Sequence, residues 1–482
     1  MIQVRPRLTA HRKVPSVTSH RSNPKLPNLN GWNQPKPRHS LGYRTRHQAR
    51  SVVVSVVAAA LVFVGSAAAM TWYDINHVID DNTISIIPQK SGSTQNTVVD
   101  PNAGQTINIL LLGQDTRSGE ENKALGGPGE AENHQSDTAM VLQISADRSY
   151  VNLVSIPRDS IVNAPSCQTS KGTIAARYDV MFNSIFANAY AKGGDLASAG
   201  SCTMAAVNSL TGLDIENFVV VDFAGMRDMV DALGGVDLCI PVATKDATTG
   251  VNLQPGMQHL DGTTATEYAR MRHGTGTDGS DIMRTTRQQY LVKEIIKEAL
   301  SKNLFTQSSQ LYQLAKTALK SLSISSGLAH ASTLVGLAMS LKDLDPTHLY
   351  MQTIPVTSWS KDINRVVWAS NADDVWEKLR KEVPLTQADD TTSETSSDSS
   401  ASPSSSDTPS ASDSASASAT PTETVDPKTG LITRADGTLI DPNTGGIVNK
   451  KNGTITDPTT GQYLGIADRY LNATVCAVNA QE

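Results

Sequence analysis

Apolar positions gather in one long run and in many short ones. The long run, SVVVSVVAAALVFVGSAAAMTWY at residues 51–73, carries no charge and is almost wholly apolar. It can supply the roughly 20 residues that a membrane-spanning helix requires. The short runs lie between residues 105 and 385, where they alternate with polar stretches. The pattern therefore predicts one transmembrane anchor (51–73) and one globular domain (105–385).

Short apolar runs at the start of the domain predict strands. They are INILLLG at 107–113, TAMVLQIS at 138–145 and YVNLVSIP at 150–157. Runs of this length that end at Gly, Pro or polar residues suit buried strands. A short turn at residues 146–148 joins the second run to the third.

Helical patterns alternate with further strands. FNSIFANAYAKGG at 182–194 predicts a helix that its glycines end. FVVVDFAGM at 218–226 predicts a strand, and the next residues predict a helix that ends at Gly234 and Gly235. VDLCI then predicts another strand. This alternation is typical of an α/β fold, and we expect a layered α-β-α domain with a central mixed sheet.

A long amphipathic helix is expected at 284–303, RTTRQQYLVKEIIKEALSKN, because its apolar residues form one stripe at helical spacing. Arg284, Arg287 and Gln288 then lie in its first turns. Backbone N–H groups at the start of a helix favour a bound anion. The patterns from 306 to 385 close the same domain.

The rest of the chain is polar and divides into two parts. Residues 386–424 are mostly Ser, Thr, Asp, Ala and Pro, which cannot form a core and predict a flexible linker. Residues 425–482 contain DPKTG, DPNTG and DPTTG, whose turn signals predict short hairpins. We reject a sortase sorting signal, since no apolar stretch and basic tail follow. A weak wall-binding module and an extended tail both remain open.

Charge is distributed unevenly along the chain. The formal net charge is −6, yet the first 73 residues contain no Asp or Glu. The basic arm at 1–50, expected to be disordered, predicts a cytoplasmic N-terminus. Everything after Trp72 is then outside the cell in a single-pass membrane protein, starting with a stalk at 74–104. A cleaved signal peptide competes, because Ser66 to Ala69 could form a cleavage site, but the basic region is longer than secretory signals carry. Orientation accounts for the arm, so we expect no nucleic-acid partner.

Four cysteines agree with an outside location. Cys167, Cys202, Cys239 and Cys476 show no C-x-x-C spacing, which argues against a zinc site. In an oxidising compartment they allow three connectivities. We favour Cys167 with Cys202, while Cys239 could simply be buried in VDLCIP.

Four polar clusters interrupt the apolar pattern: LLGQDTR, HQSDT, IPRDS and YARMRHGTGTDGSDIMRTTRQQ. We expect Asp115 and Arg117 just past a strand end and Asp137 just before the next strand. Arg158 and Asp159 follow a third strand. Ligands in open α/β sheets bind beyond the carboxyl ends of strands.

Arg270 and Arg272 belong to the fourth cluster. Two apart in an extended segment, they would point to one side. The planar guanidinium fork matches phosphate oxygens in two contacts at once.

Carboxylates beside a pyrophosphate require a divalent cation between them. Magnesium held by Asp115 and Asp137 together with phosphate oxygens is the usual solution, and it stabilises charge during phosphoryl transfer. The alternatives are that both aspartates cap helices or turns and that Arg158 and Asp159 form an ordinary ion pair. The sequence has no P-loop, H-E-x-x-H or G-x-S-x-G motif, and we leave His134 and His273 out of the site.

An ordered set of motifs resembles the LytR–CpsA–Psr family. The set is NILLLGQDTR, SDTAMVL, VSIPRDS, FNSIFANAYAKGG, VDFAGMRDMVDALGGVDLCIP and LDGTTATEYARMRH with DIMRTTRQQ. It covers residues 105–305, with a looser match to 385. The resemblance implies a magnesium-dependent transferase of phosphorus-containing groups in cell-wall assembly. Such an enzyme takes a glycopolymer from a polyprenyl-pyrophosphate carrier and joins it to peptidoglycan through a phosphodiester.

The resemblance also implies a role for each site residue. Asp115 and Asp137 would hold magnesium on the pyrophosphate, and Asp281 falls at the position of the base for the muramic acid hydroxyl. Catalytic residues would be Asp115, Asp137, Arg158, Arg270, Arg272 and Asp281. Phosphate-binding residues would be Arg117, Arg158, Arg270, Arg272, Arg284, Arg287 and Gln288.

Two departures from the family pattern bear on the site. Gln135 stands where the family often has Arg, so a phosphate contact is missing or supplied by Arg117. Residues 118–134 are long and Gly-rich, which could reshape the entrance. The family also implies an apolar groove for the lipid. Phe182, Ile185 and Phe186 could line the groove or simply pack in the core.

Two other functions remain open at this point. A hydrolase of polyprenyl-pyrophosphate-linked glycan would use the same residues with water as the acceptor. A non-enzymatic, envelope-associated transcriptional regulator would use the basic arm, but residues 1–50 contain no helix-turn-helix pattern.

Overall fold

A computed structural model describes residues 39–89, 99–101, 103–116, 120–126, 134–277, 279–301, 315–317, 319–385, 425–442, 444–458 and 463–476. It divides into two units, residues 1–69 and residues 70–482. Most of the expected basic arm and the whole expected linker, 386–424, lie outside the described residues.

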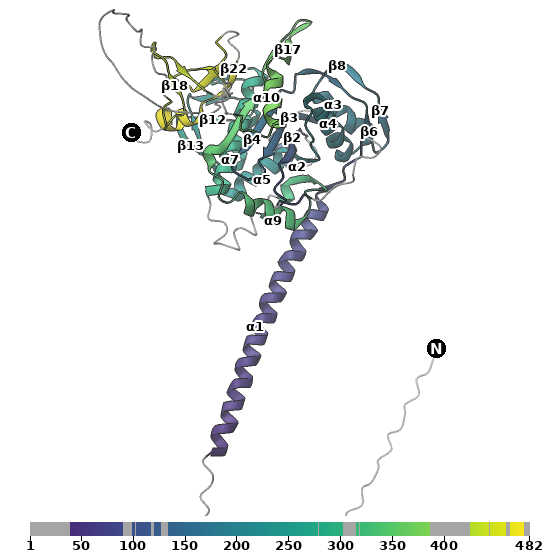
Figure 1. Ribbon diagram of the computed structural model, residues 1–482, viewed down its shortest axis with the longest axis vertical. Coiled ribbons are helices and arrows are strands. Elements are labelled where there is room, and N and C mark those ends of the chain that lie inside the picture. The colour runs from purple at the N-terminus through teal and green to yellow at the C-terminus, as the bar shows by residue number, and fades with distance from the viewer. Residues whose placement is uncertain are drawn as a thin grey trace, which may run out of the picture. The chain divides into compact units, whose positions relative to one another are not determined.

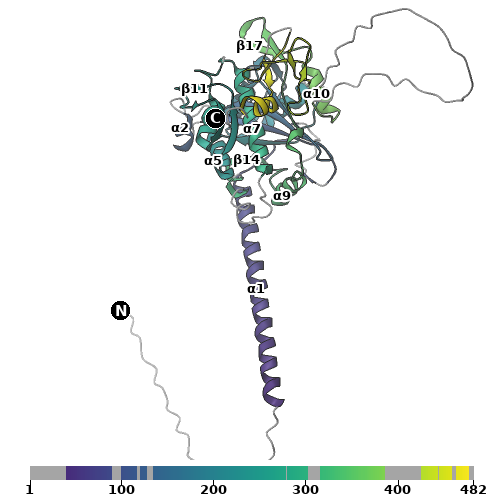
Figure 2. The same ribbon diagram turned by 90° about the vertical axis from the view of Figure 1, so that its left-hand side faces the viewer.

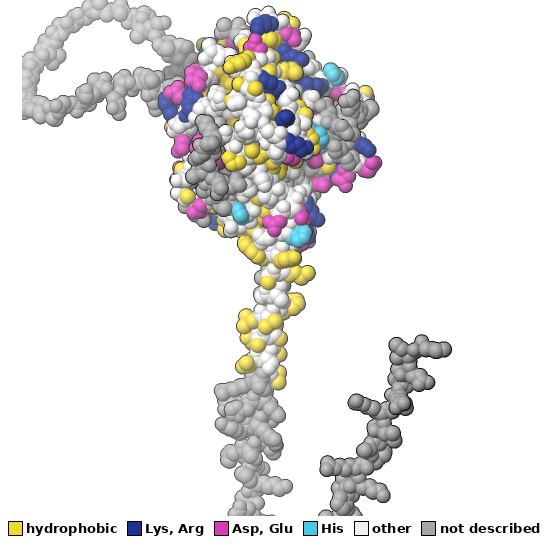
Figure 3. All heavy atoms as spheres, turned by 90° about the vertical axis from the view of Figure 1, so that its right-hand side faces the viewer, with side chains coloured by type: hydrophobic (Ala, Val, Ile, Leu, Met, Phe, Trp, Pro, Cys, Tyr) yellow, Lys and Arg dark blue, Asp and Glu magenta, His cyan; other side chains and the backbone are white. Residues whose placement is uncertain are grey.

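The described part of the first unit is the beginning of helix α1 (His39–Asp81), whose last residues belong to the second unit. Residues 39–50, which we expected in a disordered arm, are helical. Val57, Leu61 and Phe63 are among its exposed apolar side chains, and Figure 3 shows apolar side chains along the described part of this helix. Among the helices in the described part of the chain, none is long and apolar enough to cross a membrane.

A seven-stranded mixed sheet forms the centre of the second unit, in the order β1-β14-β9-β2-β3-β4-β15. Neighbours β1 and β14, β9 and β2, and β4 and β15 are parallel, whereas the other neighbours are antiparallel. Its strands are β1 (Thr83–Ile84), β2 (Ile107–Asp115), β3 (Gln135–Ile144), β4 (Val151–Ile156), β9 (Asn217–Val221), β14 (Leu322–Ser325) and β15 (Leu349–Thr353). The expected α/β class and mixed sheet are confirmed.

Helices pack on both faces of this sheet (Figure 1). Leu110 and Leu112 belong to the core shared with α3 (Asn183–Gly193), α4 (Leu196–Thr211) and α10 (Ala372–Arg380). Ile107 and Ile109, one residue out of phase, belong to the core shared with α9 (Ala331–Ser340). This alternation gives the layered α-β-α arrangement, because successive strand side chains point to opposite faces.

A third core lies around a small antiparallel sheet, β10 (Val236–Ile240) with β13 (Gly256–Leu260). Helices α5 (Phe223–Leu233), α6 (Gly262–Arg270) and α7 (Asp281–Ser301) supply its other side chains. The remaining elements of this part are α2 (Glu120–Gly126), β5 (Ile161–Ala164), β6 (Cys167–Thr169), β7 (Gly172–Ile174), β8 (Arg177–Met181), β11 (Thr244–Lys245), β12 (Asn252–Leu253), η2 (Pro346–His348), β16 (Val356–Trp359) and β17 (Asp362–Trp368).

Several expected element boundaries were wrong. The strand expected at 218–226 ends at Val221, because Asp222 caps α5 by accepting the Gly225 N–H at 2.8 Å. The stalk expected at 74–104 is partly domain. Val78 and Ile79 are buried in the α9 core, and β1 joins the central sheet.

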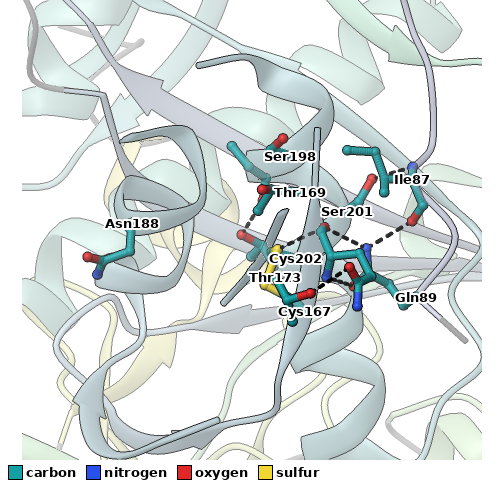
Figure 4. The surroundings of a disulfide bond; sticks show 12 residues. Ile87, Gln89, Cys167, Thr169, Thr173, Asn188, Ser198, Ser201 and Cys202 are labelled. Atoms are coloured by element: carbon teal, nitrogen blue, oxygen red, sulfur yellow. Dashed lines mark hydrogen bonds between the residues drawn. A yellow bond between two sulfur atoms is a disulfide. The ribbon is translucent and has the colours of Figure 1, made fainter. Parts of the chain in front are cut away.

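The favoured disulfide, Cys167 with Cys202, is present (Figure 4). It joins β6 to α4, and Gln89 lies against the β6–β7 hairpin. The Gln89 side chain accepts the Gln168 N–H at 2.8 Å and donates to the Gln168 carbonyl at 3.2 Å. The disulfide therefore ties a surface hairpin to the main core.

The C-terminal repeats fold into a sheet, here called the C-terminal module (described residues 425–476). Its elements are β18 (Ile432–Thr433), β19 (Leu439–Ile440), β20 (Ile447–Val448), β21 (Thr454–Thr456), β22 (Tyr463–Ile466), α11 (Asp468–Tyr470) and the π-helix η3 (Leu471–Val475). The five strands are antiparallel in sequence order. Hairpins were expected here, and the extended tail is excluded.

A repeated turn explains the D-P-x-T-G motif. The Gly430 N–H donates to the Asp426 carbonyl at 2.7 Å, and the Gly445 N–H donates to the Asp441 carbonyl at 2.8 Å. Both glycines have positive φ, 73° and 67°, which only glycine adopts cheaply.

The module is fixed to the rest of the unit in two ways. Cys476 forms a disulfide with Cys239 of β10, so Cys239 is not merely buried. Asp468 pairs with Lys293 of α7 at 2.6 Å. Figure 2 shows the C-terminal elements beside α7.

Candidate active site

Three arginines converge on Asp137. Its Oδ1 accepts from Arg158 at 2.8 Å, and its Oδ2 accepts from Arg284 at 3.1 Å and from Arg272 at 3.4 Å. Arg158 follows β4, Arg284 lies in the first turn of α7, and Arg272 lies between α6 and α7. Asp137 lies within β3 and not ahead of it as we expected. The strand starts earlier because Gln135 pairs with Asp115 of β2.

Asp281 stands beside this cluster as the first residue of α7. Its Oδ1 accepts from Arg284 and lies 3.2 Å from Arg158 Nε. Within the described part of the chain, its Oδ2 is buried and has no hydrogen-bond partner. One oxygen of Asp281 is therefore held by charge, and the other can accept a proton from a ligand.

The two carboxylates have opposite pKa shifts. Burial raises the pKa of Asp281 and outweighs the opposing charges of Arg284 and Arg158. Burial also acts to raise the pKa of Asp137, but the charges of Arg284, Arg158 and Arg272 together lower it. Asp137 is thus held as an anion, while Asp281 is the more basic carboxylate.

Asp159 forms its shorter ion pair with a residue that the sequence did not point to. Its Oδ1 accepts from Arg365 of β17 at 2.8 Å, whereas Arg158 Nε lies 3.7 Å from its Oδ2. Asp159 therefore pairs mainly with Arg365, and its contact with Arg158, the alternative that we left open, is the longer of the two. Arg365 is a single arginine 206 positions away with no motif around it, so only the fold could identify it.

These side chains face a pocket of about 510 Å³. Arg158, Arg272 and Asp281 lie on one side, and the β16–β17 hairpin supplies Asn364 and Arg365 on the other. The volume is within the range of small-molecule sites, roughly 300–1,000 Å³. Across the cluster, three guanidinium groups face two carboxylates, so the site carries surplus positive charge.

Arg272 is the most open arginine of the cluster, with 35% of its side chain exposed. Burial lowers its pKa, and the neighbouring charges of Arg284 and Arg158 lower it further. Crowding of like charges would be relieved by an added anion. The arrangement can therefore bind an anion.

The structure does not place Arg270 beside Arg272 as we expected. Arg270 is the last residue of α6, and the Met271 N–H still donates to the Glu267 carbonyl at 3.0 Å. Its guanidinium lies 4.5 Å from the centre of the Phe223 ring and donates to the Leu125 carbonyl. The segment is not extended at Arg270, because residues 262–270 form α6, a helix that we did not predict from the sequence.

Arg287 and Gln288, which we expected to bind phosphate, make hydrogen bonds to elements that neighbour α7. Arg287 is 3% exposed and donates to the Met271 carbonyl. Gln288 accepts from the Thr138 hydroxyl at 2.7 Å and donates to the Ala269 carbonyl at 3.2 Å. Both therefore join α7 to its neighbours. Arg117 lies outside the described residues.

We predicted that Asp115 and Asp137 hold magnesium together with oxygens of a substrate. Asp115 lies opposite Gln135 at the end of the β2–β3 pair, and Asp137 is the unpaired extra residue at the bulge where the register of this pair shifts. In the described residues no group of three or more His, Cys, Asp or Glu could hold a metal. Two carboxylates suffice when phosphate oxygens and water complete the shell.

The residues proposed for a lipid groove are core residues. Phe182, Ile185 and Phe186 are buried together against β2 and β3 in the core beneath α3. Ordinary packing accounts for all three.

Comparisons with known proteins agree with the motif order. The sequence pattern of the LytR_cpsA_psr family matches residues 74–382. The chain is 29% identical over 276 residues to the cell wall biosynthesis protein LcpA of Corynebacterium glutamicum, a match that covers 54% of this chain and 52% of LcpA. This chain thus spans about half the length of that relative.

A second relative is the polyisoprenyl-teichoic acid–peptidoglycan teichoic acid transferase TagT of Bacillus subtilis. It is 27% identical over 258 residues, covering 52% of this chain and 70% of TagT. Superposition on the crystal structure of Bacillus subtilis TagV covers 58% of this chain and 98% of the TagV chain, with 20% sequence identity and a TM-score of 0.44.

Proposed function

The chain belongs to the LytR–CpsA–Psr family, and on that premise we propose that it is a phosphotransferase of cell-wall assembly. It moves a glycopolymer from a polyprenyl-pyrophosphate carrier to a muramic acid hydroxyl of peptidoglycan. The observation that carries this proposal is the convergence of Arg158, Arg272 and Arg284 beside the buried carboxylate of Asp281. TagT, by its name, transfers a polyisoprenyl-linked polymer to peptidoglycan.

The arginines bind the pyrophosphate. Arg158 and Arg272 line the pocket, whereas Arg284 is 3% exposed and fixes Asp137 and Asp281. In the free protein Asp137 supplies the negative charge that holds the three guanidinium groups together. Substrate phosphate oxygens would share these donors, since each guanidinium has five N–H groups.

Asp281 acts as the base. The acceptor hydroxyl forms a new O–P bond to the phosphorus next to the glycan as the bond to the bridging oxygen breaks. The proton of the acceptor hydroxyl passes to Asp281, and polyprenyl phosphate is the leaving group. The pKa raised by burial makes this carboxylate a better proton acceptor than a solvated one.

Magnesium would be held by Asp115 and Asp137. When bound, it would offset the charge of the pyrophosphate and stabilise the leaving phosphate. This cofactor is part of the proposal and is tested by chelation followed by restoration with Mg²⁺.

We also propose that the domain works outside the cytoplasm. The two disulfides support this location, because disulfides persist in oxidising compartments. The single-pass anchor at 51–73 with a cytoplasmic N-terminus stays a prediction from the sequence. Membrane fractionation of chains with and without residues 51–73 tests it.

Mass spectrometry tests the reaction. The full chain is incubated with a polyprenyl-pyrophosphate-linked oligosaccharide, peptidoglycan fragments and magnesium. We expect a glycan–phosphate–peptidoglycan product that Arg158→Ala and Arg272→Ala abolish. Arg227→Ala is the matched control, because Arg227 pairs only with partners on α2 and α5 among the contacts described.

Two results would contradict the proposal. Release of phosphorylated glycan without attachment would identify a hydrolase. A folded protein that binds the lipid but gives no turnover, and whose function in cells depends on residues 1–45, would identify a regulator.

A further inference from the structure

A second cavity, of about 400 Å³, lies between the C-terminal module and α7. Thr286, Tyr290 and Lys293 line it from α7, three and four positions apart, so one face of the helix forms a wall. No residue of the phosphate pocket lines this cavity. Its volume is within the range of small-ligand sites, roughly 300–1,000 Å³.

The cavity runs along the edges of two sheets. Consecutive residues 347–352 line one side, and consecutive residues 464–469 line the other. Because strand side chains alternate between faces, consecutive lining residues mean that the edge of the strand meets the cavity. β15 is the last strand of the central sheet, and β22 is the last strand of the module. Edge strands present a row of N–H and C=O groups that sheet pairing does not use.

Charged groups in the walls are paired within the protein. Lys293 and Asp468 lie 2.6 Å apart, and the Asp441 carboxylate accepts the N–H and hydroxyl of Thr444 at 3.0 and 2.7 Å. Arg469 donates to the Pro427 carbonyl at 2.9 Å. The walls therefore offer backbone groups and hydroxyls, without the surplus cations of the phosphate pocket.

Two aromatic residues, His348 and Tyr350, are among the lining residues. The ring centres of His348 and Tyr350 lie 6.2 Å apart, and the half-buried Tyr350 ring also lies 6.3 Å from that of Tyr150. A sugar has a polar rim of hydroxyl groups and two apolar faces. Backbone groups along two edges suit the rim, and aromatic rings suit the faces.

We propose that this cavity binds a short, neutral stretch of glycan. The proposal deepens the proposed function and rests on it for the source of that glycan, which is the acceptor strand of peptidoglycan. Asp281 begins α7, and Tyr290 lies nine residues on, about 14 Å along the helix axis. A strand bound along the module is thereby held by the same helix that carries the base.

Binding of a defined probe tests this assignment. The probe is a β-1,4-linked tetrasaccharide of N-acetylglucosamine, which is neutral, and calorimetry on the full chain measures its affinity. Two variants alter the cavity. Tyr350→Ala truncates one of the aromatic lining residues. Gly465→Phe fills the space, because a side chain at Gly465 meets nothing closer than 3.8 Å at its first atom.

We expect the tetrasaccharide to bind the unaltered chain and Arg158→Ala equally well. Both cavity variants should bind it at least about tenfold more weakly, the effect of losing roughly 1.4 kcal/mol. Tyr178→Ala is the matched control, since Tyr178 is an exposed tyrosine of β8 that does not line the cavity.

Several outcomes would overturn the assignment. These are no binding by the unaltered chain, equal binding by both cavity variants, or binding of a free stem peptide in place of the sugar. Failure of the proposed function is distinguishable. Sugar binding without any transfer refutes only the reaction, whereas transfer with sugar binding unaffected by Tyr350→Ala and Gly465→Phe refutes only the cavity.

Discussion

Asp137 and Asp281 share two arginines, yet their pKa values shift in opposite directions. Arg158 and Arg284 contact both, but Asp137 also contacts Arg272 and uses both of its oxygens. Asp281 uses one oxygen and is buried, so desolvation dominates. The additional contact with Arg272 keeps Asp137 an anion. Asp281 lacks that contact and has one oxygen without a hydrogen-bond partner among the described residues, so it can accept a proton.

The pH dependence of transfer follows from this difference. As a base, Asp281 must be ionised, so the rate falls as the pH drops through its raised pKa. This acid limb lies above the ordinary aspartate value of about 3.9. Asp281→Asn should lower kcat by roughly 10²–10⁴ and abolish the limb. A pH–rate profile measures both, and an unchanged limb in the variant would assign the titration to another group.

Removing the charge of Asp137 should destabilise the fold. Asp137→Asn leaves the buried Arg284 and its neighbours with too little negative charge, at a cost of about 3 kcal/mol in the free energy of unfolding. Added inorganic pyrophosphate should restore part of this loss in the variant, because it supplies the missing charge. Urea unfolding with and without pyrophosphate checks the prediction, which fails if the anion stabilises the variant less than the unaltered chain.

The Asp159–Arg365 pair should control the availability of Arg158. In Arg365→Ala, Asp159 loses its 2.8 Å partner and turns to Arg158, so transfer should fall on the order of tenfold. Adding Asp159→Asn should restore activity. Transfer rates of Arg365→Ala, Asp159→Asn and the double variant test this prediction. Lys361→Ala is the control on the same hairpin, since it pairs with exposed Asp179.

Local patterns were enough to nominate most of the cluster. Arg158 stands beside a predicted strand end, Arg284 at a predicted helix start and Arg272 in a predicted extended segment, whereas the role of Asp281 came from the family resemblance. Arg365 could not be nominated, because a lone arginine acquires its role only when the β16–β17 hairpin folds over the pocket. Arg270 was misassigned for a similar reason, since its side chain follows the end of α6.

At the scale of elements, β2 and β3 set the spacing of the two candidate magnesium ligands. Their register shifts by one residue between Gly113 and Gln114, which brings Asp115 opposite Gln135. Gly113 lies tight against Thr138, whose hydroxyl donates to Gln288 of α7. The bulge therefore connects the metal candidates to the helix that carries the base.

Gly113→Ala should disturb this connection. The added Cβ would lie 2.8 Å from the Thr138 Cβ, and Thr138 must move away from Gln288. Overpacking of this kind costs about 1–3 kcal/mol, and transfer should weaken with it. Thermal unfolding and the transfer assay measure the two effects. Gly465→Ala, with 3.8 Å of room, should change neither.

Element types were easier to predict than element ends. The strands β2, β3 and β4 and the helices α3 and α7 follow clear periods in the sequence. Ends depended on side-chain contacts that no period reveals, such as the Asp222 cap that ends β9 early. The C-terminal hairpins were expected from their turn residues, but their association into one sheet needed contacts among Leu431, Val448 and Ile455.

At the scale of the whole molecule, the C-terminal module is attached to the rest of the second unit by covalent and ionic contacts. Its disulfide to β10 and the Lys293–Asp468 pair join it to the α7 face that lines the cavity. The Tyr290 hydroxyl accepts the Cys239 N–H at 3.1 Å, which couples that face to the disulfide.

Loss of this disulfide should release the module. Cys239→Ser with Cys476→Ser should lower its stability by about 2–4 kcal/mol and weaken tetrasaccharide binding. Limited proteolysis with mass spectrometry should then detect earlier cleavage after residue 425. Cys167→Ser with Cys202→Ser is the matched control, because it should loosen the β6–β7 hairpin and leave the module protected.

The bond between Cys239 and Cys476 also changes the connectivity of the chain. It closes a ring whose ends are 237 positions apart, and the expected linker at 386–424 lies within that ring. A single backbone cut in the linker would open the ring without separating the pieces. In an environment rich in proteases, the molecule would be nicked yet keep its C-terminal part, and only reduction would then let the two fragments go.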